Sequence, residues 1–185
     1  MEIRETSIPG CREIVPPVFR DERGSFEKFF HRETFARLGL ATDFAEEYHT
    51  WSHRGVVRGL HFQLPPHDLT KLVTCLAGEV LDVVLDLRVG SPTYGRHAAL
   101  PLSGERGTVI VIPPGLAHGF CVTTGPALML YKVTTAYAPD HDTGIRWDSA
   151  GIIWPDLQPI LSDRDRGFVP LEEFVSPFRF REEGC

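Results

Sequence analysis

The chain has 185 residues, of which 42% are hydrophobic and 24% are charged, and its formal net charge is −6 at pH 7. This length fits one compact domain, so residues 1–185 are expected to fold as a single unit, and the composition excludes a disordered tail, a fibrous repeat and a coiled coil. Because the chain has no basic run, it lacks the cationic face that binding to nucleic acid requires, and no nucleic-acid partner is expected.

No apolar stretch approaches the roughly 20 residues of a membrane-spanning helix, so no membrane partner is expected. The N-terminal sequence MEIRETSIPGCREI has no hydrophobic core of a secretory signal, which favours a cytoplasmic location. The four cysteines lie far apart, without a CxxC pair: Cys11, Cys75, Cys121 and Cys185. They are expected to be isolated reduced thiols rather than zinc ligands or a redox dithiol.

In chain order, the first predicted element is a short helix at residues 33–40, ETFARLGL, with Gly39 as its stop signal. Two β-rich runs follow, Leu72–Ala77 and Val80–Leu87, and Gly78 between them predicts a tight connection. In the second run apolar residues alternate with two aspartates, as the two faces of a strand require.

Two more strands are predicted further along. Thr108–Ile112 is a candidate buried strand that ends at the turn Pro113-Pro114-Gly115, and Leu128–Tyr137 is the next strand. Short strands at this spacing, in a chain with 17 Gly and 15 Pro, predict an all-β sandwich or small barrel with few short helices. No alternation of strands and helices is visible, which excludes a Rossmann fold, and no GxxxxGK[ST] phosphate loop is present.

Two stretches carry candidate chemistry. In the first, GVVRGLHFQLPPHDLTKLV at 55–73, His61 and Gln63 share one face of an extended segment, and Lys71 follows a Pro-Pro turn. The second, GTVIVIPPGLAH at 107–118, has the spacing Gly-x5-Pro-x-Gly-x2-His, which resembles the second motif of the cupin barrels. The pattern predicts a strand, a forced turn and a histidine at the start of the returning strand.

Many cupins bind a metal through three histidines and a glutamate that converge on one point. Here His61 and His118 are two candidate donors. Gln63, however, stands where the second histidine of a His-x-His pair is expected, and Lys71 stands near the position of the glutamate. Because an ammonium group cannot ligate a metal, we expect no metal and no cofactor.

Several motifs in matching order have a counterpart in one family. They are DERG at 21–24, RGLHFQ at 58–63, KLV at 71–73, GEV at 78–80, SPTYG at 91–95, PPGLAHGF at 113–120, YK at 131–132, YAP at 137–139 and LSDRD at 161–165. Together they resemble the dTDP-4-dehydrorhamnose 3,5-epimerase family, over residues from about 3 to about 170.

The resemblance implies a cupin-type double-stranded β-helix (jelly roll) that acts without a metal on a nucleotide-diphosphate-linked 4-keto-6-deoxy sugar. By the same resemblance, His61 is the general base, Asp165 the carboxylate that orients it and Tyr131 the acid on the opposite face of the sugar. Lys71 and His118 line the sugar, with Lys71 near the keto oxygen.

The resemblance also implies a homodimer with an exchanged N-terminal strand. Arg23 and Arg58 are then the arginines that hold the nucleotide diphosphate, and the strand with Arg23 completes the pocket of the other subunit. The remaining positions that the resemblance assigns to substrate binding are Phe26, Glu46, Tyr48, Tyr137, Asp142 and Arg164.

The chain departs from the family where the substrate is recognised. The family usually reads Gln-Asp-Asn-His, whereas this chain has Glu46-Glu47-Tyr48-His49. Lys28 occupies, in a gapless match, the position of a family glutamate, and Arg164 replaces a lysine. These changes leave the nucleotide open between dTDP, as the default, and GDP or CDP.

Elementary chemistry agrees with these roles. A histidine that titrates near neutrality can remove a proton next to a ketone, a cation stabilises the enolate, and inversion needs a second acid on the other face. Three points stay open: Asp163 competes with Asp165 as the partner of His61, Tyr137 either lines the cavity or packs, and Arg58 has the opposite strand parity to His61. Only a bulge or a strand end reconciles Arg58 with His61.

The sequence therefore predicts an epimerase that inverts C3 and C5 of a nucleotide-diphospho-4-keto-6-deoxyhexose, with dTDP-4-dehydro-6-deoxyglucose as the default substrate. Three alternatives remain at this stage. They are an epimerase that acts at C3 or C5 only, a metal-dependent cupin oxygenase or isomerase, and a non-catalytic barrel that binds a sugar or nucleotide.

Overall fold

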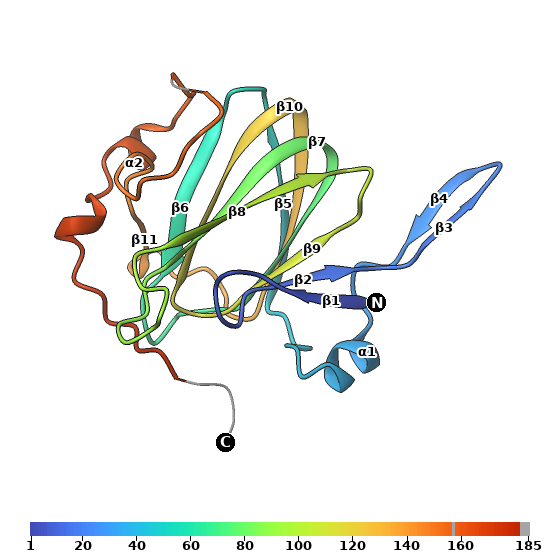
Figure 1. The fold of residues 1–185 in the computed structure, drawn as a ribbon, viewed down its shortest axis with the longest axis horizontal. Helices are drawn as coiled ribbons and strands as arrows, with labels where there is room; N and C mark the ends of the chain where they lie inside the picture. The colour runs from blue at the N-terminus through green and yellow to red at the C-terminus, as the bar shows by residue number, and fades with distance from the viewer. Residues whose placement is uncertain (157, 182–185) are drawn as a thin grey trace.

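The computed structural model describes residues 1–156 and 158–181, which form a β-rich molecule with short helical segments (Figure 1). The N-terminal part contains β1 (Glu2–Glu5), β2 (Arg12–Val15), β3 (Val18–Asp21), β4 (Gly24–Glu27), α1 (Arg32–Arg37), β5 (Glu46–Ser52) and β6 (Val57–Gln63). The rest contains β7 (Lys71–Asp86), β8 (His97–Ser103), β9 (Val109–Ile112), β10 (Leu116–Val133), β11 (Asp142–Gly144), α2 (Asp163–Arg166) and the 3₁₀ helix η1 (Leu171–Glu173).

Two long antiparallel strands, β7 and β10, form the centre of the fold (Figure 1). In the described residues the main sheet has the order β1-β2-β9-β7-β10-β6-β11, and β8 pairs with β7 beside this path. The first half of β10 pairs with β6, and its second half pairs with β5. The long strands therefore bring β5, β6 and β7 around one interior, and the predicted all-β architecture with few short helices is confirmed.

Gly78 bends one strand rather than joining two. The prediction of separate strands at Leu72–Ala77 and Val80–Leu87 is wrong, because both runs belong to β7. Gly78 has φ +74°, and a Cβ there would lie 2.5 Å from the carbonyl oxygen of Pro126. The close approach of β10 at this point requires glycine, and the register between the two strands shifts nearby.

Two other predicted boundaries also differ from the structure. The helix expected at 33–40 is α1, and the predicted stop is confirmed because Gly39 has φ +67°, the left-handed conformation common after a helix end. The strand expected at Leu128–Tyr137 instead begins at Leu116 and ends at Val133. Tyr137 therefore follows the strand, and its position does not come from strand alternation.

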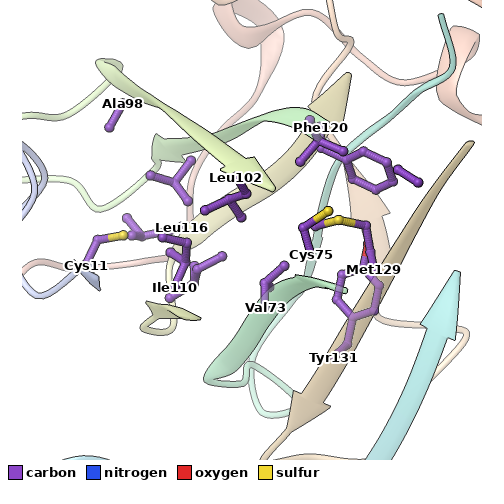
Figure 2. Packing of buried hydrophobic residues seen from close by; sticks show 14 of the residues in the cluster. Cys11, Val73, Cys75, Ala98, Leu102, Ile110, Leu116, Phe120, Met129 and Tyr131 are labelled. Carbon is purple, nitrogen blue, oxygen red and sulfur yellow. The ribbon is translucent and has the colours of Figure 1, made fainter. Parts of the chain in front are cut away.

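Apolar side chains bury both faces of β7. Val80 and Val84 belong to a cluster with Phe120, and this cluster extends to Met129 and Tyr131 (Figure 2). The alternate residues of β7 pack into a second cluster with residues from β6 and the C-terminal segment. A polar side chain on either face of this strand is therefore buried and needs a hydrogen-bonding partner.

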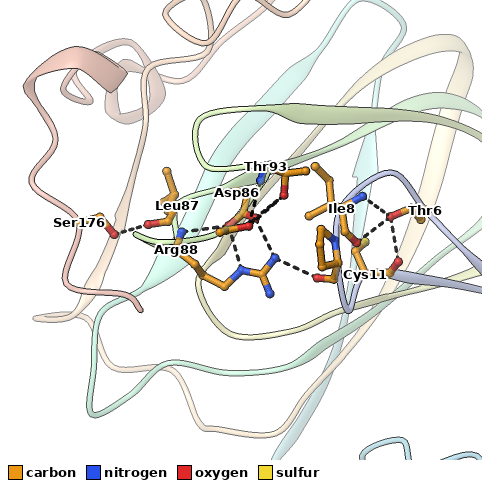
Figure 3. Close-up of polar contacts among 10 residues, drawn as sticks. Thr6, Ile8, Cys11, Asp86, Leu87, Arg88, Thr93 and Ser176 are labelled. Carbon is orange, nitrogen blue, oxygen red and sulfur yellow. Dashed lines mark hydrogen bonds and ion pairs between the residues drawn. The ribbon is translucent and has the colours of Figure 1, made fainter. Parts of the chain in front are cut away.

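Asp86, at the end of β7, obtains its partners from the following loop (Figure 3). Its fully buried carboxylate accepts hydrogen bonds from Arg88 at 2.9 and 2.8 Å, from Ser91 at 2.6 Å and from Thr93 at 2.7 Å. Burial acts to raise the pKa of Asp86, but these donors outweigh it and hold the pKa below its ordinary value. Arg88 also donates to the carbonyl of Pro9, which ties the N-terminal loop to the barrel.

The hairpin of β3 and β4 projects away from the barrel (Figure 1). Of the four cysteines, Cys11, Cys75 and Cys121 are buried free thiols, and Cys185 lies outside the described residues. Among the residues that the structure describes, no helix is long and apolar enough to cross a membrane.

Candidate active site

A cavity of about 390 Å³ lies among β5, β6, β7, β10, β11 and α2. Its size falls in the range of about 300–1,000 Å³ that is usual for small-molecule sites. The polar side chains that line it are Glu46, Tyr48, His61, Gln63, Lys71, Thr135, Tyr137, Asp142 and Arg164. Six of the residues predicted to bind substrate or to act in catalysis therefore share this cavity with His61.

A bulge in β6 places Arg58 and His61 on the same side of the strand. His61 pairs with His118, whereas Arg58 pairs with Phe120, so three steps along β6 match two along β10. The Arg58 guanidinium donates to the hydroxyl of Ser52 on β5 at 2.9 Å. The parity conflict between Arg58 and His61 is thus resolved by a bulge.

The bulge depends on Gly59. This residue has φ +122°, and a Cβ there would lie 2.6 Å from the Cα of Gly119 on β10. The Gly59 N–H donates to Oδ2 of Asp165 at 3.0 Å, so a side chain of α2 satisfies the backbone group at the bulge. The bulge at Gly59 therefore places Arg58 on the side of His61 and also holds Asp165 by a hydrogen bond.

Asp165, rather than Asp163, pairs with His61. The distance from His61 Nε2 to Asp165 Oδ1 is 2.9 Å, whereas the Asp163 side chain is fully exposed. Ser162 is the N-cap of α2 and accepts a hydrogen bond from the backbone N–H of Asp165 at 3.1 Å. Asp165 is buried, and the first turn of α2 holds it in place.

The environment of this pair keeps the imidazole neutral and the carboxylate charged. Burial lowers the pKa of His61, although its hydrogen bond with Asp165 and the charge of Asp165 act to raise it. For Asp165, burial acts to raise the pKa, but the hydrogen bonds from His61, Gly59 and Ser162 outweigh it and lower the pKa. A neutral histidine oriented by a carboxylate is suited to accept a proton.

Lys71 supplies a cation beside His61. Its Nζ lies 3.4 Å from the backbone carbonyl oxygen of His61 and lines the cavity. Burial lowers the pKa of Lys71 to about 8, while the carboxylates of Asp142 and Asp82 act to raise it. Asp142 itself accepts a hydrogen bond from Arg164 at 2.5 Å.

The ring of Tyr131 packs against the ring of Tyr48. It lies directly opposite Tyr48 in the β5–β10 register, and the two rings stack with centroids 4.8 Å apart and planes 15° apart. Burial raises the pKa of Tyr131, which is only 4% exposed. The Tyr131 hydroxyl lies 3.4 Å from that of Thr50, two residues along β5.

His118 forms a second buried pair, with Asp82. The distance from His118 Nε2 to Asp82 Oδ2 is 2.8 Å, and both side chains are buried. The His118 ring meets the Tyr131 ring edge to face with centroids 6.1 Å apart. His118 was expected to line the sugar, but it is not among the residues that line the cavity. In the predicted strand at 80–87, Asp82 lies on the face opposite the apolar residues, but the sequence alone assigns it no role. The signal that could have found it is an aspartate inside a strand that is otherwise apolar.

At the rim, Glu46 accepts a hydrogen bond from the backbone N–H of Tyr137 at 3.0 Å, and both line the cavity. The two hairpin positions predicted to bind substrate do not reach it. Arg23 pairs with Asp21, and Phe26 packs near Phe19 at the side of a separate hollow on the hairpin. The cavity of one chain therefore lacks both.

The donor set does not fit a cupin metal centre. Within the described residues, no group of three or more His, Cys, Asp or Glu is arranged to hold a metal ion. The rings of His61 and His118 are each engaged by a carboxylate, and Gln63 donates to backbone carbonyls of the neighbouring loops. Gln63 and Lys71 occupy the positions where a cupin would present further ligands.

The chain is similar to proteins of one family along most of its length. Residues 5–173 match the family model for dTDP-4-dehydrorhamnose 3,5-epimerase. The enzyme of that name from Shigella flexneri is 40% identical over 181 residues, which cover 95% of this chain and 100% of the relative. The structure of dTDP-6-deoxy-D-glucose-3,5-epimerase from Legionella pneumophila, in complex with dTDP-4-keto-L-rhamnose, superimposes with a TM-score of 0.92 at 36% identity, covering 97% of this chain and 98% of that one.

A solved structure with a different specificity is also similar. ChmJ, a 3'-monoepimerase from Streptomyces bikiniensis in complex with dTDP-quinovose, superimposes with a TM-score of 0.86 at 35% identity, covering 90% of this chain and 86% of that one. The fold and these relatives define a cupin-type carbohydrate epimerase, an isomerase, and the predicted cupin-type fold is confirmed. The chain belongs to the dTDP-4-dehydrorhamnose 3,5-epimerase family. Membership favours the epimerase over the metal-dependent and non-catalytic alternatives.

Proposed function

We propose that this protein inverts C3 and C5 of dTDP-4-dehydro-6-deoxyglucose, one centre after the other, through enolate intermediates. The observation that carries the proposal is the His61–Asp165 pair, whose histidine lines the same cavity as Lys71. The ketone at C4 already acidifies the C–H bonds on both sides of it, so a base, a cation and an acid suffice and no cofactor is needed.

His61 is the base. A hydrogen on Nε2 is donated to Asp165, which leaves the lone pair on Nδ1 free to take the proton from C3 or C5. Because burial lowers the pKa of His61, the ring is neutral at neutral pH and ready to accept that proton. The charge of Asp165 then stabilises the imidazolium that forms.

Lys71 stabilises the enolate. As the C–H bond breaks, its electron pair moves into a new C=C bond, and the C=O electrons move onto O4. A charged Lys71 near O4 donates a hydrogen bond to this oxygen and balances the negative charge. Its pKa of about 8 keeps most of the group charged at neutral pH.

Tyr131 returns a proton to the opposite face. The enolate electrons form the new C–H bond with the phenolic proton, and O4 becomes a ketone again. Tyr131 is left as a phenolate and regains a proton from solvent, while His61 loses its proton to solvent, so that both groups are ready for a second cycle. Burial keeps the phenol protonated, since it raises the pKa of Tyr131. Repeating the cycle at the other carbon gives the doubly inverted sugar. The similarity to a 3'-monoepimerase supports inversion at C3 alone as the second candidate.

The diphosphate is held by Arg58 and by Arg23 of a second subunit in a homodimer with an exchanged N-terminal strand. Two features support this arrangement. Arg23 lies on a hairpin that projects from its own barrel, and the hairpin exposes 63% of Phe19 and 60% of Phe26, apolar surface suited to a partner. Buried free thiols support a reducing compartment, and the cytoplasm is the proposed location.

The base is tested by proton NMR in D₂O with His61→Asn. The wild-type protein should place deuterium at C3 and C5, and His61→Asn should slow exchange at both carbons by at least ~10²-fold, the usual contribution of a general base. His53→Asn, at an exposed loop position, is the matched control and should exchange at the wild-type rate. Unchanged exchange in His61→Asn would refute the assignment of the base.

The proposal that the β3–β4 hairpin of one subunit completes the pocket of the other is tested by complementation between two variants. Arg23→Ala and His61→Asn are each impaired alone. If Arg23 acts across the dimer, a heterodimer of the two variants regains one pocket with both native residues, and activity returns on co-expression. If Arg23 acts within its own chain, no heterodimer pocket is restored and the exchanged-strand proposal is wrong.

A further inference from the structure

The ring of Tyr48 borders the substrate cavity at the place where Tyr131 lies behind it. Tyr48 is 40% exposed and lines the cavity, whereas Tyr131 is 4% exposed. The two residues are direct cross-strand partners, and their rings are nearly parallel at 4.8 Å. Parallel contact of this kind fixes the plane of both rings. The Tyr48 ring therefore covers one face of the Tyr131 ring on the cavity side.

The Tyr131 side chain also contacts Thr50 and His118. Its hydroxyl lies 3.4 Å from the Thr50 hydroxyl, which is long for a hydrogen bond between two hydroxyls. The His118 ring, which comes from the first half of the same strand β10, meets the Tyr131 ring edge on with centroids 6.1 Å apart. Tyr48 and Thr50 are on the same face of β5, and in the described residues β5 pairs only with β10. The position of the phenol thus depends on β5.

The Tyr48 hydroxyl stays protonated in this setting. Burial raises the pKa of Tyr48 to about 12, and the carboxylates of Asp142 and Glu46 add to the effect. An uncharged ring can stack on Tyr131 without placing a phenolate beside these carboxylates. The stacking contact therefore persists over the pH range in which His61 and Lys71 work.

We infer that Tyr48 is a positioning residue: its ring holds the phenol of Tyr131 in line with the enolate, so that the proton returns to the inverting face. The inference rests on the proposed function. It assigns the work to the aromatic ring rather than to the hydroxyl. Without the ring, the enolate is more often reprotonated by His61 on the face from which the proton left, which exchanges hydrogen without inverting the carbon.

The test compares two rates in D₂O: deuterium entering the sugar with inversion, and deuterium entering with the configuration retained. Tyr48→Leu should lower the ratio of inversion to retention by about tenfold or more, since small misplacements of a reacting group have effects of this size. Tyr48→Phe, which keeps the ring, should leave the ratio unchanged. A loss of folding would lower both rates together and would not change the ratio.

The matched control is Tyr94→Leu. Tyr94 is 44% exposed, close to the exposure of Tyr48, and lies in the loop after β7 near the Asp86 network rather than at the cavity. This variant should show the wild-type ratio. If Tyr48→Leu does not fold, Tyr48→Met removes the flat ring at similar volume and gives the same comparison.

A double variant separates positioning through Tyr131 from an independent role. Tyr131→Phe should itself favour retention, and adding Tyr48→Leu to it should change the ratio no further, because Tyr48 acts through the phenol that is already gone. An unchanged ratio in Tyr48→Leu, an equal loss in Tyr48→Phe, or a further loss in the double variant would each overturn the inference. Absence of any exchange in the wild-type protein would instead refute the proposed function.

Discussion

The charge of Lys71 should set the upper pH limit of activity. Burial lowers its pKa from 10.5 to about 8, and this difference corresponds to about 3 kcal/mol at ~1.4 kcal/mol per pKa unit. A lysine with a lowered pKa carries its charge below that pKa and loses it above. Because the enolate needs the cation, kcat/KM should fall above about pH 8, by about tenfold for each further pH unit.

The assay is the initial rate of inversion at low substrate concentration, measured across the pH range. The wild-type profile should be a bell, with a lower limb below the ordinary histidine pKa of 6.5 because burial lowers the pKa of His61. Lys71→Arg keeps its charge to a pH of about 12, so its upper limb should disappear even if its maximum rate is lower. A Lys71→Arg profile that still falls near pH 8 would refute this assignment of the limb.

Three further predictions follow from the structure. Asp165→Asn should lower kcat/KM by about 10²–10⁴-fold. It should also move the acidic limb of the pH–rate profile to lower pH, because Asp165 acts to raise the pKa of His61. An acidic limb that moves to higher pH would contradict this role of Asp165. Arg88→Met leaves the buried Asp86 carboxylate with two hydroxyls and the backbone N–H of residue 88 but no cation, and it should cost about 3 kcal/mol, a fall in Tm of about 6–12 °C. Since the pKa of Asp86 is lowered in the folded protein, the stability it contributes is present above its unfolded pKa and is lost as the pH falls through the folded pKa, so the difference in Tm between Arg88→Met and wild type should shrink in acid. Gly59→Ala should disrupt the bulge, because its Cβ would lie 2.6 Å from the β10 backbone, and a variant with native Tm and native activity would show that the bulge does not need glycine.

The sequence was sufficient for the strand-rich barrel and for most of the cavity. Alternation in 80–87 and the Pro-Pro-Gly turn mark buried strands and their ends, and these depend on local composition. The motif order also indicated His61, Lys71 and Asp165, which the structure brings together at one end of β6. Such positions are accessible from the sequence because the resemblance to a family matches the order and spacing of its motifs along the chain.

Strand irregularities limited the sequence reasoning. Strict alternation separates Arg58 from His61, and only a bulge around Gly59 unites them. Gly78 looks like a turn in the sequence, but its small size serves a bend in one long strand. Both features depend on how closely β10 approaches, which is a tertiary contact and leaves no periodic signal.

Contacts between side chains on neighbouring strands could not be predicted from the sequence either. The sequence marks Tyr48 as a predicted substrate-binding position that departs from the family, and it says nothing of the stacking of Tyr48 on Tyr131. Likewise, Asp82 and His118 lie 36 residues apart, and the β7–β10 register brings them together. Such contacts require the register of the sheet, which is set by the whole barrel.

The proposed double inversion is tested by a proton NMR time course with the wild-type protein and dTDP-4-dehydro-6-deoxyglucose in D₂O, repeated with the GDP and CDP sugars. We expect deuterium at both C3 and C5, with inversion at each, on the dTDP sugar. Deuterium and inversion at C3 alone would make the protein a single-centre epimerase. If the protons at C3 and C5 both remain on all three sugars, the proposed reaction is wrong.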